Sequence, residues 1–307
     1  MKSRYTGIDI CRLAFACLIP LLHISLPDSL PLYIVRQYVS RLGVPFFFAV
    51  SGMFLSKAIA DRGNLAAMKK QLWRIGVMLC IWFCIYAPLF SRGRYSINEY
   101  LFLTPGYLWY LSAMLFAVIP FCSIKNKSAK HGIAMILYIV GTLFGGSYQW
   151  LSGGGIGWYA GIFLSTRNGL FFAFPLMCVG EMAGKAKASM HKLLITTILL
   201  FAEITFVGTH VSSDADRSMY FFLPLFTLYF VSAVKEWNPK IDKVDLAGYS
   251  SAIYLMQYGL IWAGSKVLGV LHLTDSYWNW AVYILVMIAP VVFYCLIEKR
   301  KAARILF

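Results

Sequence analysis

The chain has 307 residues, of which 60% are hydrophobic and only 13% are charged, and its mean hydropathy is +0.68. Soluble domains carry about 25% charged residues, and a soluble protein of this length cannot bury so much apolar surface in one core. These values exclude an ordinary soluble enzyme, a disordered chain and a disulfide-rich secreted module. They indicate an all-α, polytopic transmembrane bundle in a lipid bilayer.

The chain is strongly basic, with a formal net charge of +15. In a soluble protein this excess would favour nucleic-acid binding. In a membrane protein it is typical of cytoplasmic loops rich in Lys and Arg, so we expect no nucleic-acid partner. The seven cysteines lie mostly in apolar runs and are expected to be small buried hydrophobes. Cys80 and Cys84 are one helical turn apart, but no further ligands complete a site, so no metal is expected.

The N-terminus has some features of a signal peptide, because Lys2 and Arg4 precede an apolar run. However, Arg12 and His23 interrupt this run, and no small-residue cleavage pattern closes it. We interpret the run as a retained first helix.

Apolar segments long enough to span a bilayer, at about 20 residues each, recur along the whole chain. They predict about ten spans, at 8–26, 43–60, 72–90, 106–123, 132–148, 168–184, 193–210, 218–234, 248–269 and 278–297. Only short loops remain between them. We therefore expect a single membrane-embedded domain over residues 1–307, without a separate soluble domain.

The basic residues predict the orientation of these spans. With the N-terminus in the cytoplasm, most of the 28 Lys and Arg residues fall in cytoplasmic loops, whereas the outer loops hold few, such as Arg36 and Arg41. Both termini are therefore expected in the cytoplasm. The glycine-rich sequence SGGGIG at 152–157 lies in an outer loop and lacks the Gly-Lys-Ser/Thr of a phosphate-binding loop, so we interpret it as a connector.

Two ionisable residues within the first span are the main functional candidates. Arg12 and His23 are separated by eleven positions, which on a continuous α-helix places them on one face, about 16 Å apart. A guanidinium binds phosphate, and an imidazole can act as a general base for a hydroxyl nucleophile. A phosphate-bearing ligand as long as the pantetheine arm of acyl-coenzyme A would reach both. Alternatively, Arg12 pairs with Asp9 at the inner interface, and His23 is a hydrogen-bonded bundle residue.

Other polar residues within the spans allow two interpretations each. Arg167 and Asn168 either bind acceptor hydroxyls or begin a helix at the membrane interface. Glu203 either orients His23 or joins helices through a hydrogen bond. Ser51 with Gly52 favours close helix packing over a nucleophilic role.

Several motifs resemble integral-membrane acyltransferase family three, whose members are bacterial enzymes that O-acylate surface glycans and related molecules. The similarity extends in order along nearly the whole chain. It is carried by GIDICRLAFACLIPLLH at 7–23, RLGVPFFFAVSGMFL at 41–55, LWYLSAML at 108–115, TRNGLFFAFPLMCVGEMAG at 166–184 and SSAIYLMQYGLIW at 250–262.

The resemblance implies that His23 is catalytic and that Arg12 helps to bind the acyl donor. Two positions depart from the family pattern. In KKQLWRIG at 69–76, Gln71 stands where the family often has Arg, which leaves Arg74, Lys70 and Lys69 as further donor-binding candidates. Gln257 replaces a late His. The candidates for the acceptor site or pocket are Arg167, Asn168, Glu203, Tyr254 and Gln257.

The resemblance thus predicts a multi-pass O-acyltransferase of the bacterial inner membrane. It would transfer an acyl group, with acetyl favoured, from cytoplasmic acyl-coenzyme A as co-substrate to a hydroxyl of a glycan or lipid-linked sugar, with no bound cofactor. The alternative is a transporter or exporter of a glycan or an amino acid. The same fold forms the membrane half of vancomycin-resistance serine racemases, whose soluble pyridoxal-phosphate domain has no counterpart in this sequence.

Overall fold

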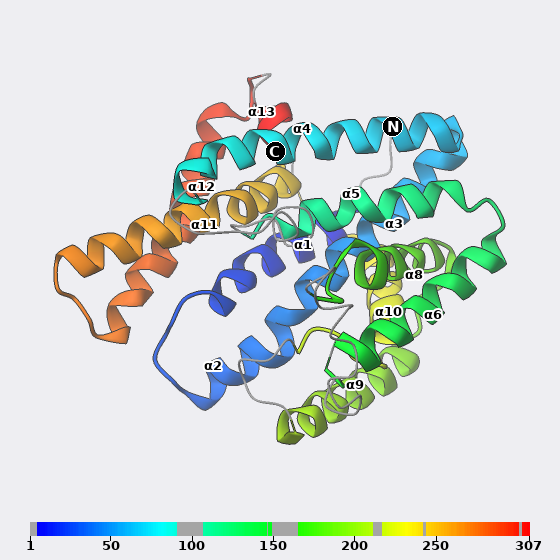
Figure 1. Ribbon diagram of the computed structural model, residues 1–307, viewed down its shortest axis with the longest axis horizontal. Helices are drawn as coiled ribbons and strands as arrows, with labels where there is room; N and C mark the ends of the chain where they lie inside the picture. The colour runs from blue at the N-terminus through cyan, green and yellow to red at the C-terminus, as the bar shows by residue number, and fades with distance from the viewer. Residues whose placement is uncertain are drawn as a thin grey trace. The chain divides into compact units, whose positions relative to one another are not determined.

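The computed structural model describes residues 5–90, 107–145, 147–148, 165–210, 217–241, 244–300 and 303–307 (Figure 1). Within these residues all regular secondary structure is helical, which confirms the all-α class. The SGGGIG sequence lies outside them. Among the described residues, five helical segments are long and apolar enough to cross a membrane: Leu30–Arg62, Asn64–Phe90, Lys127–Gly145, Met190–His210 and Ser276–Ile297. The total of about ten spans and the cytoplasmic termini stay predictions.

Each apolar segment predicted from the sequence contains a helix. The main helices are α1 (Thr6–Leu18), α3 (Gly43–Arg62), α4 (Asn64–Phe90), α5 (Trp109–Ser123), α6 (Lys127–Gly145), α8 (Phe174–Lys185), α9 (Met190–His210), α10 (Leu223–Glu236), α11 (Leu246–Val270) and α12 (Asn279–Ile297). Shorter pieces join them: η1 (Ile19–Leu22), α2 (Leu30–Ile34), η2 (Val35–Val39), η3 (Ser40–Leu42), η6 (Gly169–Ala173), η7 (Ser276–Trp278) and α13 (Ala303–Leu306).

The chain forms two compact units. The first comprises Met1–Gly43, Cys80–Pro88 and Trp237–Phe307, and the second comprises Val44–Leu79 and Leu89–Glu236. The single-domain organisation over residues 1–307 stays a prediction.

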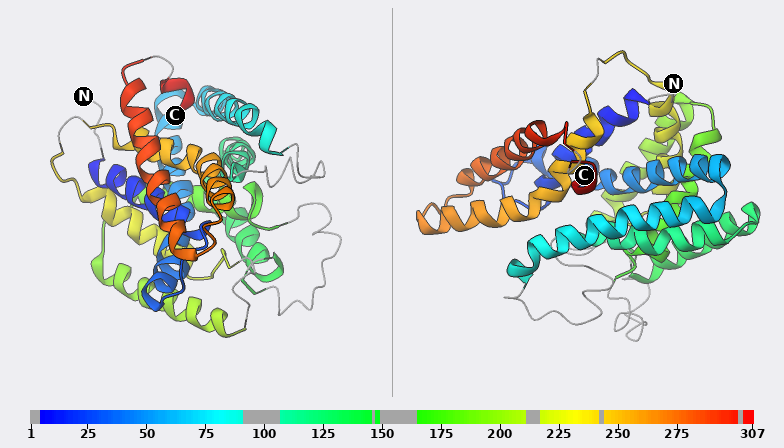
Figure 2. Two further views of the ribbon diagram at one scale, coloured as in Figure 1. Left: turned by 90° about the vertical axis from the view of Figure 1, so that its left-hand side faces the viewer. Right: turned by 90° about the horizontal axis from the view of Figure 1, so that it is seen from above.

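In the first unit, α1 and α12 both pack against α11, and Figure 2 shows α1 and α11 side by side. The backbone N–H of Thr6 donates to Asn238 Oδ1 (3.0 Å), and Ser250 Oγ donates to the carbonyl oxygen of Arg12 (3.0 Å). Tyr283 of α12 donates to the carbonyl oxygen of Cys17 (3.0 Å), and Asn279 of α12 donates to that of Ser25 (2.8 Å). The chain through α1 therefore runs antiparallel to α12, and α12 folds back on α11 after a short connection, so α1 and α11 run parallel.

In the second unit, glycines allow α3 and α8 to approach backbone to backbone. A Cβ atom added at Gly52 would overlap the carbonyl oxygen of Met177, and one added at Gly180 would overlap that of Ala49. The predicted packing role of Gly52 is therefore confirmed. Fully buried aromatic rings, including that of Phe48, extend this core.

The prediction of one continuous first helix through His23 is wrong. α1 ends at Leu18, and a 3₁₀ turn, Ile19–Leu22, precedes His23. Pro20 lies at the start of this turn, where its ring and missing N–H oppose continuation of the α-helix. Six residues at about 100° and five at about 120° turn His23 by about 120° from the face of Arg12. The two side chains therefore do not share one helix face.

Candidate functional site

His23 lies directly after the 3₁₀ turn and is half-buried. Its backbone N–H donates to the carbonyl oxygen of Pro20 (3.0 Å), which closes the turn. The half-buried ring has the partial exposure that a general base needs in order to meet a substrate hydroxyl.

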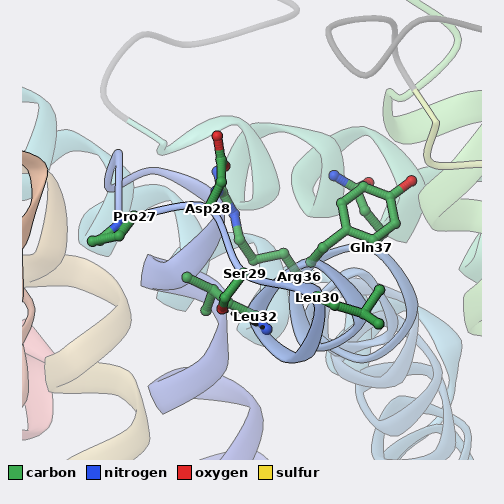
Figure 3. A pocket seen from close by; sticks show the side chains of 8 residues that line it. Pro27, Asp28, Ser29, Leu30, Leu32, Arg36 and Gln37 are labelled. Atoms are coloured by element: carbon green, nitrogen blue, oxygen red, sulfur yellow. Dashed lines mark hydrogen bonds between the residues drawn. The ribbon is translucent and has the colours of Figure 1, made fainter.

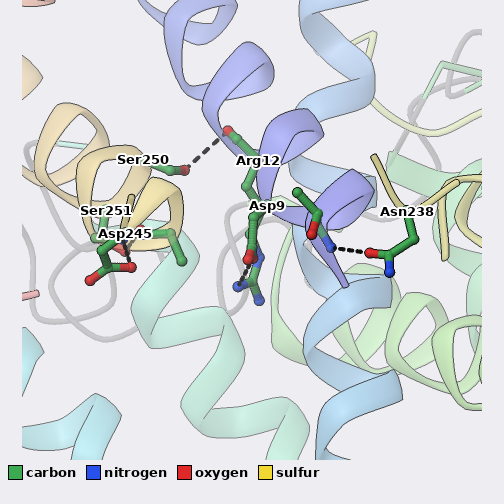
Figure 4. A network of polar contacts seen from close by, with 9 residues as sticks. Asp9, Arg12, Asn238, Asp245, Ser250 and Ser251 are labelled. Carbon is green, nitrogen blue, oxygen red and sulfur yellow. Dashed lines mark hydrogen bonds and ion pairs between the residues drawn. The ribbon is translucent and has the colours of Figure 1, made fainter. Parts of the chain in front are cut away.

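Arg12 forms an ion pair within its own helix. Its Nη1 lies 3.6 Å from Asp9 Oδ1, with 24% and 14% of the respective side chains exposed (Figure 4). This is the pairing that the sequence offered as the alternative to donor binding. The carboxylate balances the cation and orients it.

The parallel register of α1 and α11 determines where Gln257 lies. Ser250 is hydrogen-bonded to the backbone of Arg12. Gln257 is seven residues further along α11, on the same helix face and about 10 Å further along the helix axis. The same advance along α1 reaches Ile19, the first residue of the turn that precedes His23. Gln257 is only 1% exposed, and neither of its amide atoms has a hydrogen-bond partner in the described part of the chain. A buried amide without partners requires a water molecule or a ligand. Tyr254, also on α11, is half-buried.

The remaining donor-binding candidates lie on α4. Lys69, Lys70 and Arg74 are exposed, and Lys70 and Arg74 lie one turn apart on one face of the helix. They belong to the second unit, whereas Arg12 and His23 belong to the first. A donor site shared by these cations and Arg12 stays a prediction.

Arg167 and Asn168 have structural contacts at the start of η6. Arg167 stacks on the ring of Trp109, at 4.6 Å from the centroid, and its Nη1 donates to Ser218 Oγ (3.4 Å). Asn168 Oδ1 accepts hydrogen bonds from the N–H groups of Leu170 (2.9 Å) and Phe171 (3.1 Å), so this residue caps the helical turn. Acceptor binding by either residue stays a prediction.

Glu203 is buried in the second unit and holds the segment that leads into α10. Its carboxylate accepts hydrogen bonds from the N–H groups of Phe221 (2.7 Å) and Phe222 (2.9 Å) and from the hydroxyl of Tyr148 (2.8 Å). These contacts connect α9 to the residues that directly precede α10, as the interpretation of Glu203 as a helix-joining residue requires. The orientation of His23 by Glu203 has no support in these contacts.

Sequence reasoning missed a buried ion pair between α6 and α8. Lys130 lies between the predicted spans 106–123 and 132–148, where a short loop is expected, but its side chain is only 6% exposed, and its Nζ lies 2.5 Å from Glu181 Oε2. The imidazole of His131 also faces this carboxylate, at 3.4 Å, and Lys185 lies 3.6 Å from its other oxygen. A Glu within an apolar span was the one signal that could have suggested a buried basic partner.

Comparison with curated proteins finds relatives that are named racemases. An amino-acid racemase from Enterococcus faecalis is 26% identical over 301 residues, which cover 83% of this chain and 41% of the relative. A serine/alanine racemase from Enterococcus gallinarum is 24% identical, with 98% of this chain and 47% of the relative covered. The chain thus spans less than half of the length of these relatives. No solved structure matches the chain significantly.

The family model for the acyltransferase domain of family 3 matches residues 5–298. This region includes both units and all the site candidates described above, from Arg12 to Gln257. The apolar helices agree with a multi-pass membrane protein of this class. The chain therefore belongs to acyltransferase family 3.

Proposed function

We propose that the chain is a bacterial inner-membrane O-acyltransferase that transfers an acyl group, with acetyl favoured, from cytoplasmic acyl-coenzyme A to a hydroxyl of a cell-surface glycan or related envelope molecule. The observation that carries this proposal is the match of the acyltransferase domain over residues 5–298. The half-buried imidazole of His23, in the same unit as Arg12 and Gln257, supports the assignment of the chemistry to this unit.

In this reaction His23 accepts the proton of the acceptor hydroxyl while the oxygen attacks the thioester carbonyl carbon. The tetrahedral intermediate then collapses, the carbon–sulfur bond breaks, and the coenzyme A sulfur takes the proton from the imidazolium. The intermediate carries a negative charge on oxygen, which a preorganised donor stabilises. The buried amide of Gln257 is our candidate donor. It lies seven residues beyond Ser250 along α11, and the same advance from Arg12 along α1 reaches the turn that precedes His23.

Donor binding is assigned to Arg12 together with Arg74, Lys70 and Lys69. The planar guanidinium of Arg12 is suited to form two parallel hydrogen bonds to a phosphate group, and the ion pair with Asp9 fixes the orientation of this guanidinium. The exposed cations of α4 add positive charge on the predicted cytoplasmic side. Gln71 contributes no charge at the position where the family often has Arg, so the lysines of α4 supply point charges in its place.

The test uses membranes that contain the full chain and endogenous acceptors, with radiolabelled acetyl-coenzyme A. We expect His23→Ala to reduce acetyl transfer by about 100-fold or more, the usual contribution of a general base. The matched control is His191→Ala, which removes an exposed imidazole from α9 and is expected to retain transfer. Size-exclusion profiles in detergent verify the fold of both variants. Transfer by His23→Ala at the parental rate would refute the assignment.

A second function is favoured by the relatives that are named amino-acid and serine/alanine racemases. Their matched portion could serve amino-acid transport, and the same would then hold for this chain. Proteoliposomes distinguish the two functions, because a transporter accumulates labelled serine without acetyl-coenzyme A. An acyltransferase consumes acetyl-coenzyme A and accumulates no serine.

A further inference from the structure

An open pocket of about 390 Å³ lies in the first unit, just beyond His23 in the sequence (Figure 3). It is lined by residues from 27–37, which include the apolar side chains of Leu30 and Leu32 and the charged side chains of Asp28 and Arg36. Its size lies within the range of small-molecule sites, about 300–1,000 Å³. The predicted topology places this segment on the outer side of the membrane.

Arg36 is the first polar feature of this pocket. Its Nε is buried and has no hydrogen-bond partner within the described segments. The neighbouring Arg41, in contrast, donates its Nε to Gln37 Oε1 (2.9 Å). Arg36 also lies in a π-helical stretch, Val35–Val39, a geometry that is frequent at functional sites. A buried guanidinium nitrogen without a partner is costly, and an anionic ligand would offset this cost.

Asp28 is the second polar feature and carries the opposite charge. It lines the same pocket, is exposed to solvent, and forms no ion pair with Arg36 in the part of the chain that the structure describes. The pocket therefore presents a separate cation and a separate anion, with a net charge of zero. A purely anionic ligand would meet repulsion from Asp28, and a purely cationic ligand would meet repulsion from Arg36. A neutral polyol would leave both charges without an ionic partner.

We propose that this pocket binds a small zwitterionic ligand of the α-amino-acid class. The carboxylate of the ligand pairs with the guanidinium of Arg36, a geometry that permits two parallel hydrogen bonds. Its ammonium group pairs with the carboxylate of Asp28. The apolar walls of Leu30 and Leu32 accommodate the ligand's carbon atoms.

The test compares serine with molecules that lack one of its charges, using calorimetric titration of the purified full chain in detergent. Removal of the ammonium group gives 3-hydroxypropionate, and removal of the carboxylate gives ethanolamine. Glucose represents neutral polyols. We expect serine to bind, with each of the other three at least about tenfold weaker, a difference of about 1.4 kcal/mol. Equal affinity for serine and glucose, or for serine and either single-charge molecule, would overturn the proposal.

Two variants assign the charges to the residues. Arg36→Gln is expected to weaken serine binding about tenfold and to remove the preference for serine over ethanolamine. Asp28→Asn is expected to remove the preference for serine over 3-hydroxypropionate. The control, Lys266→Gln, removes an exposed cation from α11 and is expected to leave the Kd unchanged. An unchanged Kd for Arg36→Gln would overturn the proposal, as would an equal loss in the control.

The ligand series on the unaltered chain decides the proposal even if a variant fails to fold. Because no acyl donor is present in the titration, the result is independent of the reaction assigned to His23. Failure of this site and failure of the proposed acyl transfer are therefore separate outcomes.

Discussion

The close contact between α3 and α8 makes Gly180→Ala a sensitive test of the second unit. A Cβ atom at this position would overlap the backbone carbonyl of Ala49, and it would lie only 2.7 Å from the Cα of that residue. Backbone atoms of a packed helix cannot rotate away as a flexible side chain can. The two helices must therefore separate, and the reciprocal contact of Gly52 with Met177 is lost with them.

The magnitude follows from two opposing terms. Overpacking of a close contact costs about 1–3 kcal/mol, and a backbone contact belongs at the upper end, about 3 kcal/mol. Replacement of a helical Gly by Ala stabilises the helix by about 1 kcal/mol, because Ala has the higher helix propensity. We expect Gly180→Ala to lower the free energy of unfolding by about 2 kcal/mol.

Gly76→Ala provides the matched control. A Cβ atom at Gly76, within α4, would meet no heavy atom within 4 Å, so only the gain in propensity of about 1 kcal/mol remains. The two variants should thus shift the melting temperature in opposite directions in detergent, with a separation of about 5 °C or more. Equal melting temperatures for Gly180→Ala and the parent would refute the backbone-contact reasoning.

Two buried carboxylates give further predictions, both measured by thermal melting in detergent. Glu203→Ala should destabilise the chain by about 3 kcal/mol because two partly buried N–H groups lose a charged acceptor, whereas Thr205→Ala, at an exposed position on the same helix, should have a small effect. Similar losses for the two variants would contradict this role. Glu181→Gln should cost about 3–5 kcal/mol because it leaves the Lys130 ammonium buried without a counter-charge. Addition of Lys130→Met should then recover part of the loss, and a purely additive double variant would argue against the pair.

Hydropathy was sufficient to predict much of the fold. The position of each main helix followed from apolar length alone, because only helices satisfy the backbone within a bilayer. The packing role of Gly52 followed from its place in an apolar span, since small residues allow helices to approach closely.

The geometry around the candidate site was less predictable. The common face assumed for Arg12 and His23 depended on unbroken α-helix, and Pro20 changes the helical period at the residues that matter. The burial of Lys130 could not be predicted, because its partner, Glu181, lies in another helix far along the chain. Local patterns do not reveal such partners, because they depend on tertiary packing.

The early end of α1 also determines how far each substrate must travel. Thirteen residues of α-helix and four of 3₁₀-helix extend about 28 Å, slightly less than a hydrocarbon layer of about 30 Å. With the N-terminus in the cytoplasm, as predicted, His23 would lie just beneath the opposite boundary of this layer. The acyl donor would then have to thread its thioester across nearly the full thickness, whereas a bulky acceptor could remain outside and present a single hydroxyl.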